Sequence, residues 1–462
     1  MAHLSEEKSA EQKLTTTNNV EYETKAYKKR WYILAVFIWY SGINAYQWVE
    51  YTIVNDLVAK YYGVSSIAVD WTAIIFMFLY PFFVVPASYI IDKKGLKAAG
   101  LIGCIGTAVG TWVKIFSVRE DLFWVVMIGQ AIVSASQIII LCLPPKIAAV
   151  WFKPNEASTA CALGVFGTQL GTAVGYILTP LIVPVSDDPE IVASGLKTMC
   201  WSLSASIIPA VIAVIFYFPS YPPKAPSVAQ AKERFEKPKF NTKSFFKSMS
   251  DLFYNKGFVI HMVGYSISIA VFSGIGTLLS QFIIFYFPDQ RELAGAMGFT
   301  IVVAGMVGSI SFGVILDKTK KYKETTFVIY LLSAFSVIAF MYALEFQSKY
   351  FTYASCAFLG VFTSAYWSVG FELAVELTYP SEESTTTGIL FAMTQLAGFL
   401  TTAALGYLNQ WFGPYWSLAS QAALLFIGTV VTGFIPNDLR RQAAFAAEKK
   451  AKFEPIPLME KV

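Results

Sequence analysis

Long apolar segments separated by short polar ones follow one another along almost the whole chain. Each has the roughly 20 residues that a helix needs to cross a hydrocarbon layer of about 30 Å. Twelve such segments can be counted, at 31–54, 71–91, 98–117, 122–143, 157–183, 196–217, 258–286, 294–316, 325–344, 351–377, 386–409 and 414–435. The pattern predicts an all-α membrane protein with twelve transmembrane helices.

A basic segment, residues 218–257, divides the apolar segments into two sets of six with related sequences. Asp92 and Asp317, at the ends of the second and eighth segments, lie 225 positions apart. Gln169 and Gln395 lie 226 positions apart, in "STACALGVFGTQLG" and "STTTGILFAMTQLAG". Several matches at nearly one offset indicate a duplicated six-helix unit. Two pseudo-symmetric six-helix halves with a binding site between them resemble the plan of the major facilitator superfamily.

The net charge is +4, but the positive residues are unevenly distributed. If the N-terminus and every second loop lie on one side of the membrane, that side holds 29 of the 35 Lys and Arg residues. The positive-inside rule then places both termini in the cytosol and requires an even number of spans. The basic run "KERFEKPKFNTKSFFK" favours this orientation, with contact to membrane lipids, over nucleic-acid binding.

These features predict a domain organisation and exclude most other classes of protein. With 55% hydrophobic and 14% charged residues, the chain is not an ordinary soluble protein. We expect a cytosolic tail over 1–30, a first half over 31–217, a cytosolic linker over 218–257, a second half over 258–436 and a cytosolic tail over 437–462. We expect a monomer in the plasma membrane. No catalytic, metal-binding or cofactor motif is recognisable, so an enzyme is not expected.

Polar residues in the first apolar segment, "INAYQWVEYTIV" at 43–54, are unusual for a helix that faces lipid. Side chains four positions apart share a helix face, so Tyr40, Asn44 and Trp48 are predicted to form one stripe, with Glu50 pointing elsewhere. A Trp near a helix end is often only an interfacial anchor. An anchor does not need Asn44 one turn deeper, and the stripe therefore indicates a polar pathway.

Amide side chains recur on helices that are expected to line the space between the halves. The fourth segment carries Gln130 and Gln137 on one side, and the fifth and eleventh carry the repeat-related Gln169 and Gln395. Any single amide can simply join two helices by a hydrogen bond worth roughly 0.6–2 kcal/mol. Several of them, together with a Trp, favour a cavity that recognises a small polar solute.

The charge of that solute follows from the other side chains near the membrane centre. Lys114 stands alone in the third segment, and no cluster of Arg or Lys is predicted there for an anionic solute. An aromatic face attracts a desolvated ammonium group by about 0.5–2 kcal/mol without a buried counter-ion. An aromatic face with neutral amides therefore favours a small organic cation.

Charged residues at repeat-related positions are candidate gates. Lys146 follows "LPP" at the end of the fourth segment, and the offset of 226 leads to Glu372, with Glu376 one turn further. These residues can close the cytosolic mouth as an ion pair, or they can be a static pair or separately solvated charges. Asp92 and Asp317 can each meet a helix N-terminus or a Lys and hold one gating state, unless they belong to ordinary solvated turns.

The same segments resemble a known family, the feline leukaemia virus subgroup C receptor-related proteins of the major facilitator superfamily. The similar motifs, in order between about Arg30 and Arg441, are "NAYQWVEYTIV", "YYGVSSIAVDW", "DLFWVVMIGQ", "LPPKIAAVWF", "STACALGVFGTQLGTAVG", "VVAGMVGSI" and "GFELAVELTYP". The resemblance implies facilitated diffusion of choline and ethanolamine by a uniporter. It also implies that Trp48 covers the ammonium group and that Gln137 and Gln395 contact the substrate.

Two residues depart from what the resemblance implies. Better-known members of the family place a substrate-facing Tyr where this chain has Ser273, beside the retained Phe272. The aromatic cage then has one wall fewer, or Phe272 turns in to replace it. Glu50 replaces an expected Gln and is interpreted as attracting cations to the outer mouth.

Two alternative functions stay open at this point. The first is haem export by the same fold, a role also proposed for members of the family. Haem transfer often uses His or Cys as iron ligands, and the chain has only two His, His3 and His261. This counts against haem binding by iron ligation, but not against binding through apolar contacts. The second is a non-transporting membrane receptor, for which a lining of amides has no evident use.

Overall fold

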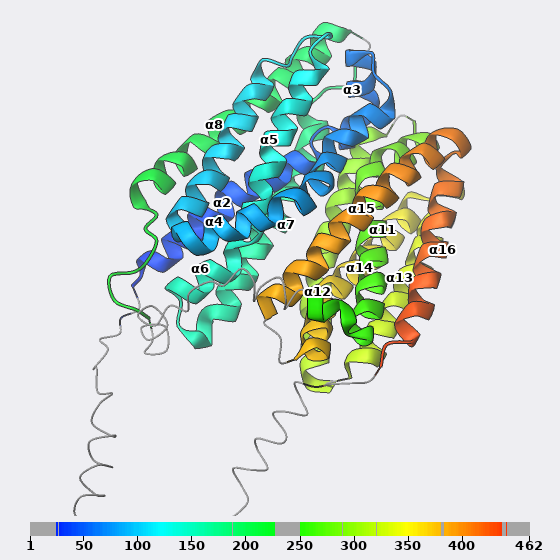
Figure 1. Cartoon of the computed structure of the whole chain (residues 1–462). Helices are drawn as coiled ribbons and strands as arrows, with labels where there is room; N and C mark the ends of the chain where they lie inside the picture. The colour runs from blue at the N-terminus through cyan, green and yellow to red at the C-terminus, as the bar shows by residue number, and fades with distance from the viewer. Residues whose placement is uncertain are drawn as a thin grey trace, which may run out of the picture.

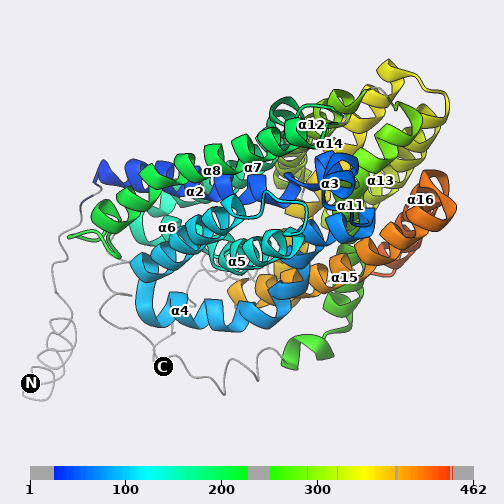
Figure 2. The same ribbon diagram turned by 90° about the horizontal axis from the view of Figure 1, so that it is seen from above.

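The computed structural model describes residues 27–186, 188–226, 250–288, 290–319, 321–379 and 383–436, together with Lys25 and Arg440. Within these ranges the secondary structure is helical, without strands. The first set of helices is α2 (Lys29–Val49), η1 (Thr52–Val54), α3 (Asn55–Tyr62), α4 (Ser66–Ile115), α5 (Phe123–Leu141), α6 (Leu143–Trp151), α7 (Pro154–Ile182) and α8 (Pro189–Tyr217). The second set is α11 (Lys256–Tyr286), α12 (Arg291–Thr319), α13 (Tyr322–Glu345), α14 (Lys349–Thr378), α15 (Glu383–Phe412) and α16 (Pro414–Gly433). The two sets lie beside each other (Figures 1 and 2), and we call them the N-half and the C-half.

Eleven helical segments in the described part of the chain are long and apolar enough to cross a membrane. Two of them, Ser66–Ile91 and Lys93–Ile115, make up α4, which reverses direction at Gly95. Gly95 has φ +81°, a left-handed conformation that residues with a Cβ rarely adopt. The 21-residue α2 is the twelfth long helix. These helices confirm the all-α membrane fold that the apolar segments predict.

The first apolar segment differs from its prediction in one respect. We expected a single helix over 31–54, whereas α2 ends at Val49 and the chain continues through η1 into the short helix α3. The interruption falls where the polar residues gather, because polar side chains can bond to the main-chain carbonyls that the end of a helix leaves without partners. It places Trp48 in the last turn of α2.

Small residues let helices approach closely inside the N-half. A methyl group added to Gly171 of α7 would lie only 2.1 Å from the main-chain oxygen of Gly42 in α2. One turn away, a methyl group on Gly167 would lie 2.7 Å from the side chain of Ile38. Close backbone approach is the usual means of packing helices in a membrane, where apolar side chains gain little by leaving lipid. This close approach packs α2 tightly against α7.

The two halves contact each other around one end of the bundle, the end that carries α3, which we call the α3 end (Figure 1). There α7 packs on α12, where the ring of Tyr176 fills the space left by Gly298. On the other side of the bundle α4 packs on α15, where the rings of Trp71 and Phe399 have their centroids 5.8 Å apart. These contacts bring α2, α7 and α11 together at the junction of the halves.

Candidate functional site

Trp48 lies half-buried at the junction of the two halves. Its ring reaches across to α11, so that a methyl group added to Gly276 would come within 3.2 Å of Cη2 of Trp48. The hydroxyl group of Tyr176 in α7 donates a hydrogen bond to the main-chain oxygen of the same Gly276, at 2.9 Å. Two aromatic side chains of the N-half thus converge on one backbone position of the C-half.

Further aromatic side chains continue from this point along the C-half. Phe272 precedes Gly276 by one turn of α11, and its ring meets the ring of Trp367 edge to face at 6.4 Å. The ring of Trp367 lies 5.8 Å from that of Phe391, which lies 4.9 Å from Tyr80 of the N-half. Trp367 therefore supplies an aromatic side chain next to Phe272. Sequence reasoning missed Trp367 and Phe391, although Phe391 stands one turn before Gln395.

Three of the predicted site amides, those of Gln137, Gln169 and Gln395, differ from their neighbours in being available. Gln137 and Gln169 are half-buried and Gln395 is 8% exposed. None of the three has a hydrogen-bond partner within the part of the chain that the structure describes. An amide that joined two helices would show such a bond. These three side chains therefore keep donors and acceptors free for a solute.

Helix geometry relates the available amides to the junction. Gln169 lies seven positions before Tyr176 and so shares the face of α7 that meets the C-half. Gln395 lies one turn after Phe391 on α15, on the same helix face as this ring, which packs against Trp367. Gln137 lies on α5, one turn after Val133, in the region that α5 shares with α2.

The structure places Tyr40 and Asn44 inside the N-half. Tyr40 is fully buried, and the amide group of Asn44 donates hydrogen bonds to Oγ1 of Thr107 and to the main-chain oxygen of Val133. Asn44 and Gln47, three positions on, therefore both contact α4 and α5, whereas Trp48 reaches the C-half. Its amide nitrogen is committed to the packing of one half.

Two expectations about charges are wrong. Lys114 does not stand alone, because its ammonium group forms an ion pair with Oε1 of Glu50, 64 positions earlier. Glu50 does not attract cations at an outer mouth, because both side chains of the pair are only 1% exposed. Sequence spacing gave no signal for this pair, since the two residues belong to different helices.

The predicted gating residues are placed only in part. The side chains of Asp92 and Asp317 lie outside the described residues. Lys146 is half-buried in α6, Glu372 is exposed in α14 and Glu376 is buried one turn further. The halves contact each other at the α3 end, whereas these residues belong to the opposite end. Their role as a gate stays a prediction.

Polar contacts close the α3 end between the halves. The amide group of Gln281 in α11 donates to Oδ1 of Asp70 in α4 at 2.7 Å, and Asn55 of α3 donates to the same oxygen at 2.9 Å. Arg291 at the start of α12 forms an ion pair with Asp56 of α3, at 2.6 Å. The sequence did not single out these residues, because the two pairs that cross between the halves join segments more than 200 positions apart.

Comparison with known proteins agrees with this architecture. Residues 31–361 match the family model described as Major Facilitator Superfamily. The choline/ethanolamine transporter flvcr2b of Danio rerio is 39% identical over 422 residues, which cover 91% of this chain and 87% of the relative. The chain belongs to the FLVCR family of the Major Facilitator Superfamily.

Other members and structures support the same assignment. The human choline/ethanolamine transporter FLVCR2 is 35% identical over 91% of this FLVCR-family chain and 80% of its own length. An uncharacterized MFS-type transporter of Caenorhabditis elegans is 42% identical over 92% of this chain and 72% of its own length. The xylose transporter XylE of E. coli, in a partially occluded inward-open conformation, has a TM-score of 0.67 at 13% identity, covering 89% of this chain and 100% of that one. The protein is a multi-pass membrane transporter and not an enzyme.

Proposed function

We propose that this FLVCR-family transporter carries choline and ethanolamine by facilitated diffusion. The observation that carries the proposal is the position of Trp48, which is half-buried and contacts the C-half at Gly276. Ring faces attract ammonium groups, including the quaternary ammonium of choline. The names of the relatives, choline/ethanolamine transporters, agree with this choice of substrate.

The other residues of the proposed site are Gln137, Gln169, Gln395 and Phe272, with Trp367 added by the structure. The amides can bond to the hydroxyl group that choline and ethanolamine share, because they are not engaged in helix packing. Phe272 and Trp367, whose rings meet edge to face, offer the aromatic surface. Neutral amides and aromatic rings place no negative charge against the cation, so release does not require an ion pair to break.

Transport by alternating access requires the contacts at the α3 end to break and re-form. Each of the bonds from Gln281 to Asp70, from Arg291 to Asp56 and from Tyr176 to Gly276 joins one half to the other. Rocking of the halves about the site would open this end while the opposite end closes. We place the α3 end outside the cell, with both termini cytosolic in the plasma membrane, and Lys146, Glu372 and Glu376 at the inner gate.

Haem export is less well supported. His261 is fully buried, and its Nε2 donates to the main-chain oxygen of Gly370 at 2.8 Å. Nε2 used in this way is not available to ligate iron, and the other ring nitrogen, Nδ1, is enclosed within the C-half. The position of His261 thus supports a structural role within the C-half.

The test is uptake of radiolabelled choline by cells that express the wild-type chain or Trp48→Ala. Loss of a cation–π contact of about 0.5–2 kcal/mol would weaken binding roughly 2- to 30-fold, and the KM should rise accordingly. Trp124→Ala is the matched control, because Trp124 is 59% exposed at the start of α5. An equal KM for all three proteins, or no choline uptake by wild-type protein at the cell surface, would refute the proposal.

A further inference from the structure

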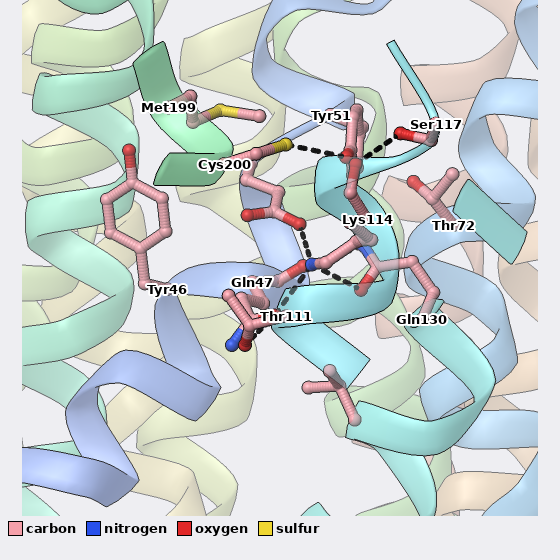
Figure 3. A network of polar contacts seen from close by, with 12 residues as sticks. Tyr46, Gln47, Tyr51, Thr72, Thr111, Lys114, Ser117, Gln130, Met199 and Cys200 are labelled. Atoms are coloured by element: carbon pink, nitrogen blue, oxygen red, sulfur yellow. Dashed lines mark hydrogen bonds and ion pairs between the residues drawn. The ribbon is translucent and has the colours of Figure 1, made fainter. Parts of the chain in front are cut away.

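A buried polar network surrounds the last turn of α2 (Figure 3). The ammonium group of Lys114, near the end of α4, donates to Glu50 and, at 2.6 Å, to the side-chain oxygen of Gln47. Oγ1 of Thr111, one turn earlier on α4, donates to the main-chain oxygen of Thr107 at 2.6 Å and lies 3.1 Å from the same Gln47 oxygen. Gln130 of α5 adds a bond from its amide nitrogen to the main-chain oxygen of Gln47, at 2.9 Å.

This arrangement explains why α2 ends where it does. The last carbonyl groups of a helix have no partner within it and carry partial negative charge, so they favour donors and cations. Gln130 supplies a donor to one of these carbonyl groups, and the ammonium group of Lys114 supplies the cation. Interrupted transmembrane helices of this kind occur at the binding sites of transporters, where the free backbone groups need such partners.

The network holds the residues on both sides of Trp48. Gln47 directly precedes it and Glu50 follows two positions later, and both are bonded to Lys114. Trp48 itself points away from the network, to Gly276 of the C-half. With the backbone on either side restrained, only the two side-chain torsions of Trp48 remain free.

We propose that Lys114 is a positioning residue for substrate binding, which acts through Glu50 and Gln47 to hold Trp48 against the site. The proposal rests on the proposed function, in which Trp48 covers the ammonium group. The network lies entirely within the N-half, on α2, α4 and α5, so it moves with Trp48 when the halves rock. The positive charge that it contains is matched by Glu50 and so does not repel a cationic substrate.

The experiment must separate positioning from folding. Removing only one partner would leave an unpaired buried charge, which is strongly destabilising, whereas replacing both by neutral groups of similar size is often neutral for stability. The variant to test is therefore the double substitution Glu50→Gln and Lys114→Met. The matched control is Arg30→Met with Glu156→Gln, which removes another ion pair of the N-half, remote from Trp48.

Two measurements are made on both variants and on the wild-type chain. The first is choline uptake, with the maximal rate expressed per transporter at the cell surface. The second is the rate at which a thiol reagent labels Gly276→Cys, in a chain whose five native cysteines are replaced by Ala, because Trp48 shields position 276. We expect the network variant to raise the KM about tenfold, a factor that corresponds to the loss of one cation–π contact of Trp48. The maximal rate should stay within about twofold of the wild-type rate. We also expect labelling to be several-fold faster, and the control to change neither KM nor labelling.

Each outcome decides the proposal. A raised KM with faster labelling supports it, because a purely structural role would lower the amount of protein at the surface and leave the KM unchanged. An unchanged KM and labelling rate overturn it. If wild-type protein at the surface takes up no choline, the proposed function fails, and the labelling of Gly276→Cys alone then decides whether Lys114 positions Trp48.

Discussion

Replacing Gln281 by Leu should open the α3 end of the transporter. In the structure the amide group of Gln281 in the C-half donates to the carboxylate of Asp70 in the N-half at 2.7 Å, and it accepts a bond from Asn409 of its own half at 2.8 Å. Leu keeps the volume but has no donor. The substitution therefore removes a bond that exists only while the halves are together at this end.

The size of the effect follows from that single bond. A hydrogen bond to a charged group contributes about 1.5–3 kcal/mol, and Asp70 is buried, so water does not replace the lost donor while the end stays closed. The bond from Asn409 to Gln281 lies within the C-half, so we expect its loss not to favour one state over the other. The closed population should fall roughly 10- to 100-fold relative to the open one.

The assay is thiol labelling of Met77→Cys in a chain without its native cysteines. Met77 is buried against Gly398 of the other half, where a methyl group would lie 3.0 Å from its sulfur. A reagent applied to the α3 side should label this position at least tenfold faster when Gln281 is Leu. Asn255→Ala, which breaks a bond to the Leu377 carbonyl within one half, is the control and should leave the rate unchanged. Equal rates with and without Gln281→Leu would refute the reasoning.

Two further predictions concern packing and charge. Gly171→Leu should destabilise the protein by about 1–3 kcal/mol or more, because its Cβ would collide with the Gly42 carbonyl, and the melting temperature in detergent should fall; Gly388→Ala, with nothing within 4 Å, should change it little. Asp56→Asn should destabilise the closed state of the α3 end, relative to the open state, by only about 0.2–1 kcal/mol, because both side chains of the pair with Arg291 are partly exposed. Added salt should reduce this difference from wild type. A salt-independent difference in the labelling of Met77→Cys would contradict this reading.

The number of the long helices, and their approximate extent except at the end of α2, could be predicted from the sequence. A segment that crosses the hydrocarbon layer must satisfy every backbone group within itself, so its length and apolar composition are prescribed before any packing is known. The duplicated motifs around Gln169 and Gln395 likewise indicated two related halves. The motifs that resemble the FLVCR family indicated the transporter class, and the comparisons confirm it.

The partners of the polar residues could not be predicted in the same way. The polarity of Asn44, Gln47 and Gln130 shows that each needs a partner, but their amide bonds are made within the N-half, while Gln137 and Gln395 make none among the described residues. Whether an amide is bonded within one half or stays free depends on the rotation of its helix and on the neighbouring helices. Sequence spacing gives the face relative to other residues of the same helix only.

The tertiary structure alone decided the pairs that link distant segments. Glu50 meets Lys114, and Asp70 meets Gln281 across 211 positions, because the packing of the halves brings their helices together. A charge in a membrane helix must be paired or hydrated, and the sequence states that requirement without naming the partner. Glu50, which we expected to attract cations, is buried and pairs with Lys114 instead. A carboxylate removed from water is stable only beside a compensating charge.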